Sequence, residues 1–273
     1  MTKKKYELNF HQSFTVSIDY VLKIMKLYFK NDLEYSKEEI SELTGIPTGK
    51  SSGKVVPHIK YAKYFGLINY NIDKGKYKIN ITDLGNILLE EDPYLNEEIS
   101  LLLINYLICS EEEGADMWYY ISNILMPKYN GKITKKLLIK ELELRYIKNK
   151  VININPWTMY YKSVFKKLRL YSFIDDNFLK KDIKIHKEYI YMYSYLFMKE
   201  WEKRYSVSEI TINSIDKFNW KEKLFISRQD SYKILDYMSE EGIIQFNKQL
   251  TPVTIVKLKN SSYLLKKIYS KII

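Results

Sequence analysis

Cysteine and histidine are scarce in this chain of 273 residues. It has one cysteine, Cys109, and three histidines, His11, His58 and His186. A single cysteine cannot form an internal disulfide, and one thiol among three scattered imidazoles lacks the paired spacing of a zinc site. We therefore expect a protein of a reducing compartment that holds no structural metal and needs no cofactor.

Long apolar runs and targeting signals are also missing. The longest nearly uninterrupted apolar stretch, residues 99–109, is far shorter than the about 20 residues that cross a bilayer. The first residues, Met-Thr-Lys-Lys-Lys, lack the apolar core of a signal peptide. We expect a cytoplasmic globular protein with no membrane partner, organised as one large domain or two to three small ones.

The common catalytic motifs are missing as well: the sequence has no G-x-S-x-G and no H-E-x-x-H. Residues 44–51 resemble a phosphate-binding loop, but Thr44 replaces the first glycine and a polar helix is predicted where that loop needs a buried strand. The one [DE]-x-K triplet starts at Asp182, with Asp175 and Asp176 upstream. Charges around a turn explain it better than a nuclease centre, so we predict no catalytic residues.

Arginine is the fourth scarcity, because only four of the 44 basic residues are arginines. Lysine supplies the excess over 33 acidic residues, and part of that excess follows the AT-rich bias that also favours asparagine, isoleucine and tyrosine. The charge is nevertheless segregated. Residues 91–130 carry one basic and eight acidic residues, whereas residues 45–80 carry seven lysines against Asp73 alone. A local excess of this kind predicts a polyanionic partner.

Residues 10–90 have the pattern of a winged helix-turn-helix. Apolar residues near a 3.6-residue period predict a helix over 15–29, and Ser36 with Glu39 forms a capping box for a second, short helix. A third helix is predicted from Pro57 to Tyr64 or Phe65. Alternating strands at 67–72 and 77–81 form the wing hairpin, and Thr82 caps a further helix.

The rest of the chain repeats this architecture without repeating its sequence. Helices are predicted over 97–109, 115–126, 134–146 and 157–170. A short segment with apolar residues at 171–176 and a possible strand at 183–185 follow. A third unit has a helix over 231–240, strands near 242–245 and 254–258, and a last helix from Ser262. The predicted fold is mainly α with small β-hairpin wings, in tandem winged helix-turn-helix-like units with domains at 1–90, 91–205 and 206–273.

The turn, third helix and wing of the first unit are the predicted surface for duplex DNA. Small residues and lysines in the turn suit a backbone phosphate, the N-terminal end of the third helix usually reaches base edges, and the wing touches phosphate or a groove edge. The predicted DNA-contacting residues are Lys50, Ser51, Ser52, Lys54, His58, Lys60, Tyr61, Lys63, Lys74, Lys76 and Lys78. Because this unit has no arginine, we expect backbone contacts more than base readout.

The rival interpretation is a scaffold whose winged helices bind protein partners, since such folds also serve as interaction modules. The lysines would then keep a polar hairpin soluble, and the tyrosines would pack. The acidic run over 90–116 could dock a basic partner or stabilise helix N-termini.

Several segments together resemble the bacterial family called domain of unknown function 4007, most clearly over residues 10–125. They are Phe10-His11-Gln12-Ser13-Phe14, residues 45–54, residues 58–68, Thr82-Asp83-Leu84-Gly85, Asp92-Pro93-Tyr94-Leu95 and Trp118-Tyr119. The resemblance implies a genomic setting of phage defence and sulfur-based DNA modification, often beside a sulfate-reductase-like enzyme, and it carries over no catalytic residues. The predicted function is an accessory or regulatory DNA-binding protein of such a system, whose other subunits are further possible partners.

Overall fold

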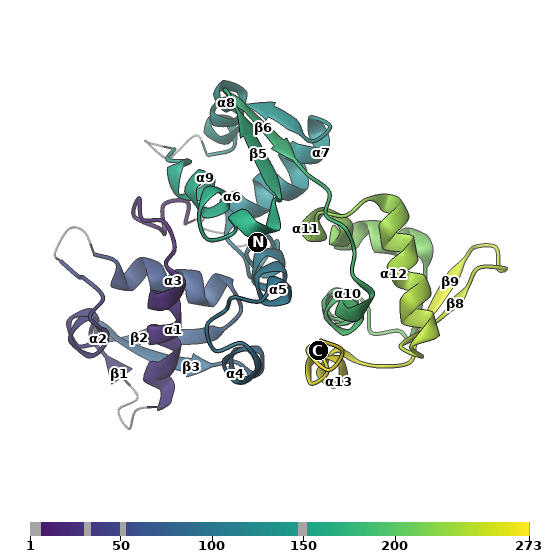
Figure 1. Cartoon of the computed structure of the whole chain (residues 1–273), viewed down its shortest axis with the longest axis horizontal. Coiled ribbons are helices and arrows are strands. Elements are labelled where there is room, and N and C mark those ends of the chain that lie inside the picture. Colours follow the sequence, from purple (N-terminus) through teal and green to yellow (C-terminus); the bar gives the residue numbers. More distant parts are fainter. Residues whose placement is uncertain (1–6, 30–33, 50–52, 147–151, 273) are drawn as a thin grey trace. The chain divides into compact units, whose positions relative to one another are not determined.

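The computed structural model of the chain describes residues 7–29, 34–49, 53–146 and 152–272. These residues are mainly helical and form three small antiparallel sheets of three strands each (Figure 1). Internal contacts divide the chain into unit 1, residues 1–181, and unit 2, residues 182–273. Unit 1 holds two of the sheets and unit 2 holds the third.

The first part of unit 1 surrounds the first sheet. Its elements are α1 (Ile18–Lys26), a 3₁₀ turn (Leu27–Phe29), β1 (Glu34–Tyr35), α2 (Lys37–Thr44), α3 (Val55–Tyr64), β2 (Ile68–Asp73), β3 (Lys76–Ile81) and α4 (Asp83–Glu91). The predicted capping box is confirmed: the Glu39 amide donates to Ser36 Oγ at 3.1 Å, and the Ser36 amide donates to the Glu39 carboxylate at 2.6 Å. Thr82 Oγ1 accepts from the Gly85 amide at 2.9 Å, so α4 also begins where predicted.

The second part of unit 1 surrounds the second sheet. Its elements are α5 (Glu98–Ile108), a continuous helix made of α6 (Asp116–Tyr119), a π-helical segment (Tyr120–Leu125) and α7 (Met126–Lys128), then β4 (Lys132–Thr134), α8 (Lys135–Arg145), α9 (Asn155–Lys162), a 3₁₀ turn (Lys166–Leu168), β5 (Tyr171–Ile174) and β6 (Asn177–Lys180).

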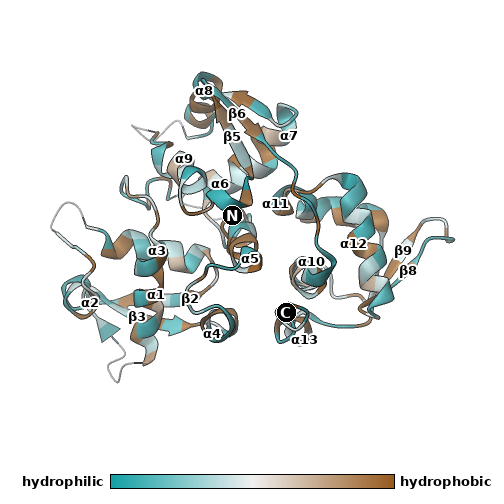
Figure 2. Ribbon diagram, in the orientation of Figure 1, coloured by the Kyte–Doolittle hydropathy of each residue, from teal (hydrophilic) through white to brown (hydrophobic). Residues whose placement is uncertain are grey.

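Helix α5 is the buried centre of unit 1. Its residues from Ile99 to Ile108 are all buried, and it is largely apolar in Figure 2. Cys109, which follows it, is fully buried with Sγ 3.5 Å from Ser122 Oγ, so the prediction of a packing residue is confirmed. An aromatic cluster joins the two parts of unit 1, since the Phe65 ring lies 6.3 Å from that of Tyr160 and 6.1 Å from that of Phe165.

Unit 2 packs around one long helix. Its elements are a 3₁₀ turn (Lys187–Tyr189), α10 (Ile190–Arg204), β7 (Glu209–Thr211), a 3₁₀ segment (Ile212–Phe218), α11 (Trp220–Leu224), α12 (Arg228–Glu240), β8 (Ile244–Asn247), β9 (Thr254–Lys257) and α13 (Ser261–Leu265). Helix α10 packs against α12 and α13, and Phe197 of α10 lies 5.2 Å from the Trp220 ring. This packing places α10 in unit 2, whereas the predicted boundary at 205 assigns it to the central region.

The three sheets share one strand order. In each, the last strand of the three is central, giving β1-β3-β2, β4-β6-β5 and β7-β9-β8. In each, helical segments fill the chain between the first and second strands, and a hairpin joins the second to the third. The repeat that the sequence indicated is therefore present at the level of element order. The short first strands, β1, β4 and β7, were not predicted.

Two predicted elements differ from the structure. The strand predicted at 183–185 is wrong, because Asp175 and Asp176 form a tight turn and β6 begins at Asn177 immediately after it. The helix predicted over 157–170 ends at Lys162, where Ser163 leaves the helical region with ψ −92°. In the part of the chain that the structure describes, no helix is long and apolar enough to cross a membrane.

Candidate nucleic-acid interface

His58 lies inside unit 1 and not on the surface where we predicted DNA contact. Its side chain is fully buried, its Nε2 accepts from the Ser17 amide at 2.9 Å, and its Nδ1 lies 2.6 Å from the Lys54 carbonyl oxygen. Burial lowers the pKa of His58 to about 4, so the ring is neutral at physiological pH. The prediction of a DNA contact by His58 is wrong, because the N-terminal end of α3 packs against α1.

Tyr61 is also buried, because a segment that precedes α1 covers it. The chain segment before α1, residues 7–14 (here the N-terminal segment), lies along α3 and covers it. The Phe10 ring lies 4.9 Å from the ring of Tyr61 and 4.7 Å from that of Tyr64, and Tyr61 Oη donates to the Phe14 carbonyl at 3.2 Å. Tyr61 is fully buried, so the prediction that it reaches DNA is also wrong.

Lys60 is held by the same N-terminal segment. Its ammonium pairs with the Glu7 carboxylate, and 17% of its side chain is exposed. Lys63, one turn further along α3, is exposed and its Nζ lies 5.2 Å from the centre of the Tyr70 ring. Lys54 is half-buried at the start of α3, with Nζ 5.7 Å from the ring centres of Phe14 and Tyr20. Of the predicted α3 residues, Lys63 alone is well exposed.

The three lysines of the hairpin are at the surface, as predicted. Lys74 and Gly75 form the two-residue turn between β2 and β3, with φ values of +46° and +82°, which is the geometry of a tight hairpin turn. Lys74, Lys76 and Lys78 are all exposed. Lys76 Nζ lies 3.8 Å from a Glu39 carboxylate oxygen, whereas the described residues form no ion pair with Lys74 or Lys78.

An acidic surface adjoins one side of this hairpin. A shallow open groove of about 570 Å³ is lined by Glu34, Tyr35, Glu39, Glu42, Leu43, Lys76 and Lys78. Its three carboxylates oppose a polyanion, so the groove side of the hairpin is unsuited to nucleic acid. The tip at Lys74 and the opposite side, near Lys63, are the basic parts of this surface.

The turn before α3 carries the remaining predicted residues. Lys50, Ser51 and Ser52 lie outside the described residues. At the edge of this turn the Lys54 amide donates to the Pro47 carbonyl at 2.8 Å. A Cβ added to Gly53 would lie 2.9 Å from Thr48 Cα, so glycine is needed for this close approach.

Sequence reasoning missed the covering of α3 by the N-terminal segment. The aromatic Phe10 and His11 before the first helix were the available signal. Both are buried, and His11 lies with its ring 6.3 Å from that of Trp118 on α6. Burial lowers the pKa of His11 to about 4.

The acidic residues considered for catalysis lie at the turn of the second sheet's hairpin and just after it. Asp175 and Asp176 are exposed at the turn between β5 and β6, and Asp182 is exposed just after β6. Within the ranges that the structure describes, no group of three or more His, Cys, Asp or Glu side chains is placed to hold a metal ion.

Fold and sequence together define a mainly helical protein with three like-ordered small sheets, and the chain belongs to the family DUF4007, described as a protein of unknown function. The family matches residues 10–173. Among solved structures, a magnesium ion-bound crystal structure of SspB superposes with a TM-score of 0.73 at 14% identity, covering 97% of this chain and 87% of that one. A second SspB crystal structure gives a TM-score of 0.71 at the same identity and coverage. At this identity the likeness shows the fold alone. Comparison with curated proteins gives no match.

Proposed function

We propose that this protein binds duplex DNA through its first unit, as a non-enzymatic accessory or regulatory component of a bacterial defence or DNA-modification system. The genomic part of the proposal, including sulfur-based (phosphorothioate) DNA modification, rests on the implied setting of the family. The physical part rests on the charge and exposure of the hairpin.

We further infer that each sheet and its helices form a winged helix-turn-helix-like unit. The order helix, strand, two helices and hairpin in α1 to β3 supports this inference, and so does the strand order β1-β3-β2. In such a unit the second of the two helices and the hairpin are the parts that meet DNA. These parts are α3 and the hairpin of β2 and β3.

One observation carries the proposal: Lys63 and Lys74 are exposed and, among the described residues, have no carboxylate partner. Unpaired lysines on α3 and at the tip of the hairpin are suited to phosphate oxygens, where they release counterions. With α3 covered and without arginine in this unit, binding would be directed at the backbone and weakly dependent on sequence.

The covering of α3 favours one alternative, a scaffold that binds partner proteins and not DNA. A helix that the N-terminal segment packs against is not free to enter a major groove. The mixed groove beside β1 and α2, with its exposed Leu43, would then be the surface for a partner.

The test measures binding of the full chain to a random-sequence duplex by fluorescence anisotropy across a salt series. The variant carries Lys63→Gln and Lys74→Asn. Asparagine is chosen at position 74 because it tolerates positive φ and preserves the turn. Each lost phosphate contact should lower the slope of log K against log salt by about 1. The matched control is Lys26→Gln, an exposed lysine of α1 outside this surface.

A reduced slope and affinity in the double variant, with Lys26→Gln equal to wild type, support the proposal. If the wild-type chain does not bind duplex at about 50 mM salt, or if the double variant binds as tightly as wild type, this surface is not a DNA site. The scaffold interpretation is then the better one.

A further inference from the structure

Helix α12 of unit 2 occupies the same place in its unit as α3 does in the first. Both are the last helix before the hairpin, and both sheets have the last strand in the centre. The corresponding helix of the second sheet is α9. If any of the three enters a DNA groove, it must present a free face with side chains that can reach bases.

Helix α12 has such a free face with an arginine on it, while α3 and α9 do not. On α3 the N-terminal half is buried, including His58 and Ile59. On α9 the exposed residues include Asn155, Met159 and Lys162, and none of the residues of this helix is an arginine or a glutamine.

The N-terminal half of α12 is amphipathic. Ser231, Ile234, Leu235 and Met238 are buried on one side. The other side presents Arg228, Gln229, Tyr232 and Lys233 to solvent.

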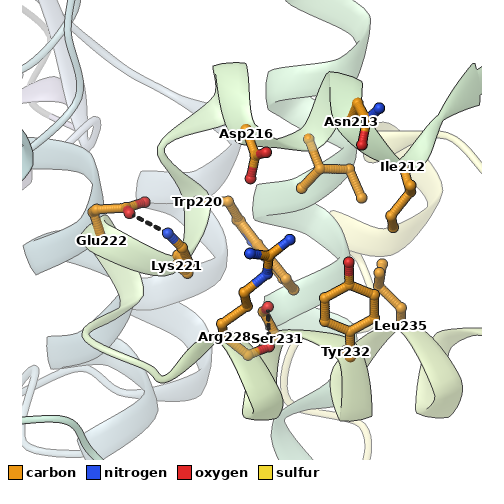
Figure 3. Close-up of a pocket in the computed structure, with 11 residues that line it drawn as sticks. Ile212, Asn213, Asp216, Trp220, Lys221, Glu222, Arg228, Ser231, Tyr232 and Leu235 are labelled. Carbon is orange, nitrogen blue, oxygen red and sulfur yellow. Dashed lines mark hydrogen bonds and ion pairs between the residues drawn. The ribbon is translucent and has the colours of Figure 1, made fainter.

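Arg228 differs from the half-buried Arg145 and Arg204. Arg145 pairs with Asp116 at 3.1 Å and Arg204 pairs with Glu200 at 2.5 Å. The guanidinium of Arg228 forms no hydrogen bond or ion pair with any described residue, and only its carbonyl oxygen is engaged, by Ser231 Oγ at 2.7 Å. Figure 3 shows Arg228 and Tyr232 extending from α12 toward the segment that carries Asn213 and Asp216.

The cavity beside Arg228 does not give this residue a role in binding a small molecule. The space between α12 and the 3₁₀ segment Ile212–Phe218 measures about 30 Å³. That volume is about the share of one water in the liquid, which is too small for a nucleotide. Trp220 lines this cavity, is buried, and has no partner for its indole nitrogen among the described residues, which suits a bound water. Arg228, at the exposed mouth, is available to a large partner.

We infer that α12 is a second duplex-DNA contact of this protein and that it reads base edges in the major groove. This inference rests on the proposed DNA binding but places base recognition on unit 2. Arg228 has the planar fork that binds guanine O6 and N7, and the neighbouring Gln229 has the amide that binds adenine N6 and N7. Lys233, one turn further, lies on the same exposed face.

The hairpin of this unit is fixed beside α12. Lys248, which directly follows β8, pairs with Asp236 of α12 at 2.5 Å. Helix α12 and strand β8 of the hairpin are therefore neighbours in this unit. Only Asp230 adds an acidic group to the first turn of α12, and it is engaged by the Ser227 hydroxyl at 2.9 Å and by Lys233 at 3.2 Å.

The experiment selects bound sequences from a random duplex library with the full chain and compares wild type with Arg228→Ala, Arg228→Lys and Gln229→Ala. Wild type should enrich a short motif containing guanine, and Arg228→Ala should reduce the preference for that motif roughly tenfold or more. Arg228→Lys keeps the charge but loses the two-pronged contact, so it should retain overall affinity and lose the preference. Gln229→Ala should relax the neighbouring position.

The matched control is Lys266→Ala, an exposed cation of the same unit at the end of α13. It should leave the enriched motif unchanged. Thermal melting of each variant checks folding, which the exposed Arg228 should not affect.

The outcomes separate the two proposals. If wild type enriches no motif, or if Arg228→Ala keeps it or weakens all sequences equally, base reading by α12 is refuted. The first-unit proposal then stands or falls on its own lysine variant. If wild type binds no duplex at low salt, both proposals are refuted.

Discussion

The imidazole Nε2 of His58 accepts a hydrogen bond from the backbone amide of Ser17 at 2.9 Å, joining α3 to the start of α1. The second ring nitrogen lies 2.6 Å from the Lys54 carbonyl oxygen and donates to it. The Ser17 contact needs the neutral ring, because a protonated Nε2 would face another donor. A residue predicted to touch DNA thus holds two helices together.

Stability should fall as the pH is lowered from about 6.5 to about 4, because of His58 and His11. Burial lowers the pKa of each to about 4 from the ordinary histidine value of 6.5, so in this range the unfolded chain binds protons that the folded chain does not. The contribution is fully present above about 6.5 and is lost as the pH falls through this window. It amounts to up to about 3 kcal/mol per histidine. Urea unfolding at several pH values measures it.

The matched variant is His58→Gln, whose amide can accept from Ser17 and donate to Lys54 without titrating. It should remove about half of the pH dependence and leave the part due to His11. His186→Gln, at a partly exposed ring on the surface of unit 2, is the control for replacing a histidine outside the core. An unaltered pH dependence in His58→Gln would contradict the buried neutral state.

Phe10→Ala should destabilise unit 1 by about 3–5 kcal/mol, the usual cost of deleting a buried phenyl ring. Phe10 is 3% exposed and its ring meets those of Tyr61, Tyr64 and Trp118. The loss of this contact frees the N-terminal segment from α3. Chemical denaturation compares it with Phe29→Ala, whose ring is 64% exposed and whose loss should cost less than about 0.5 kcal/mol. Equal effects of the two variants would show that the segment contributes little.

The local elements of this fold could be predicted from the sequence because their signals are local. Ser36 with Glu39, and Thr82 with Gly85, are capping contacts between residues three apart, and both are present. The two-residue strand β1 escaped prediction because its pairing partner, β3, lies about 40 residues away in the chain. Short first strands have no periodic signal of their own.

The candidate site was less predictable, because exposure on α3 depends on distant segments. Helical spacing placed Tyr61 near solvent, which holds only if nothing covers that face. The N-terminal segment covers it, through Phe10 and the Glu7–Lys60 pair. The hairpin lysines were predicted correctly as exposed, since a tight turn at Lys74 and Gly75 projects from the sheet whatever packs elsewhere.

Gly85→Ala should destabilise unit 1 although alanine favours helices. Gly85 lies in the first turn of α4, and a Cβ there would lie 2.2 Å from the Leu67 carbonyl oxygen and 2.8 Å from Ile81 Cγ1. The Leu67 oxygen is a backbone atom that also accepts from the Thr82 amide at 3.0 Å, so it cannot move without breaking that bond. The expected cost is about 1–3 kcal/mol, as for other overpacked sites, after the gain of about 1 kcal/mol in helix propensity.

Asn86→Ala, at the next position of α4, gains propensity without a clash and should be neutral or slightly stabilising. Thermal unfolding of both variants decides the matter, since a Gly85→Ala chain as stable as Asn86→Ala would mean that α4 can shift away from β2.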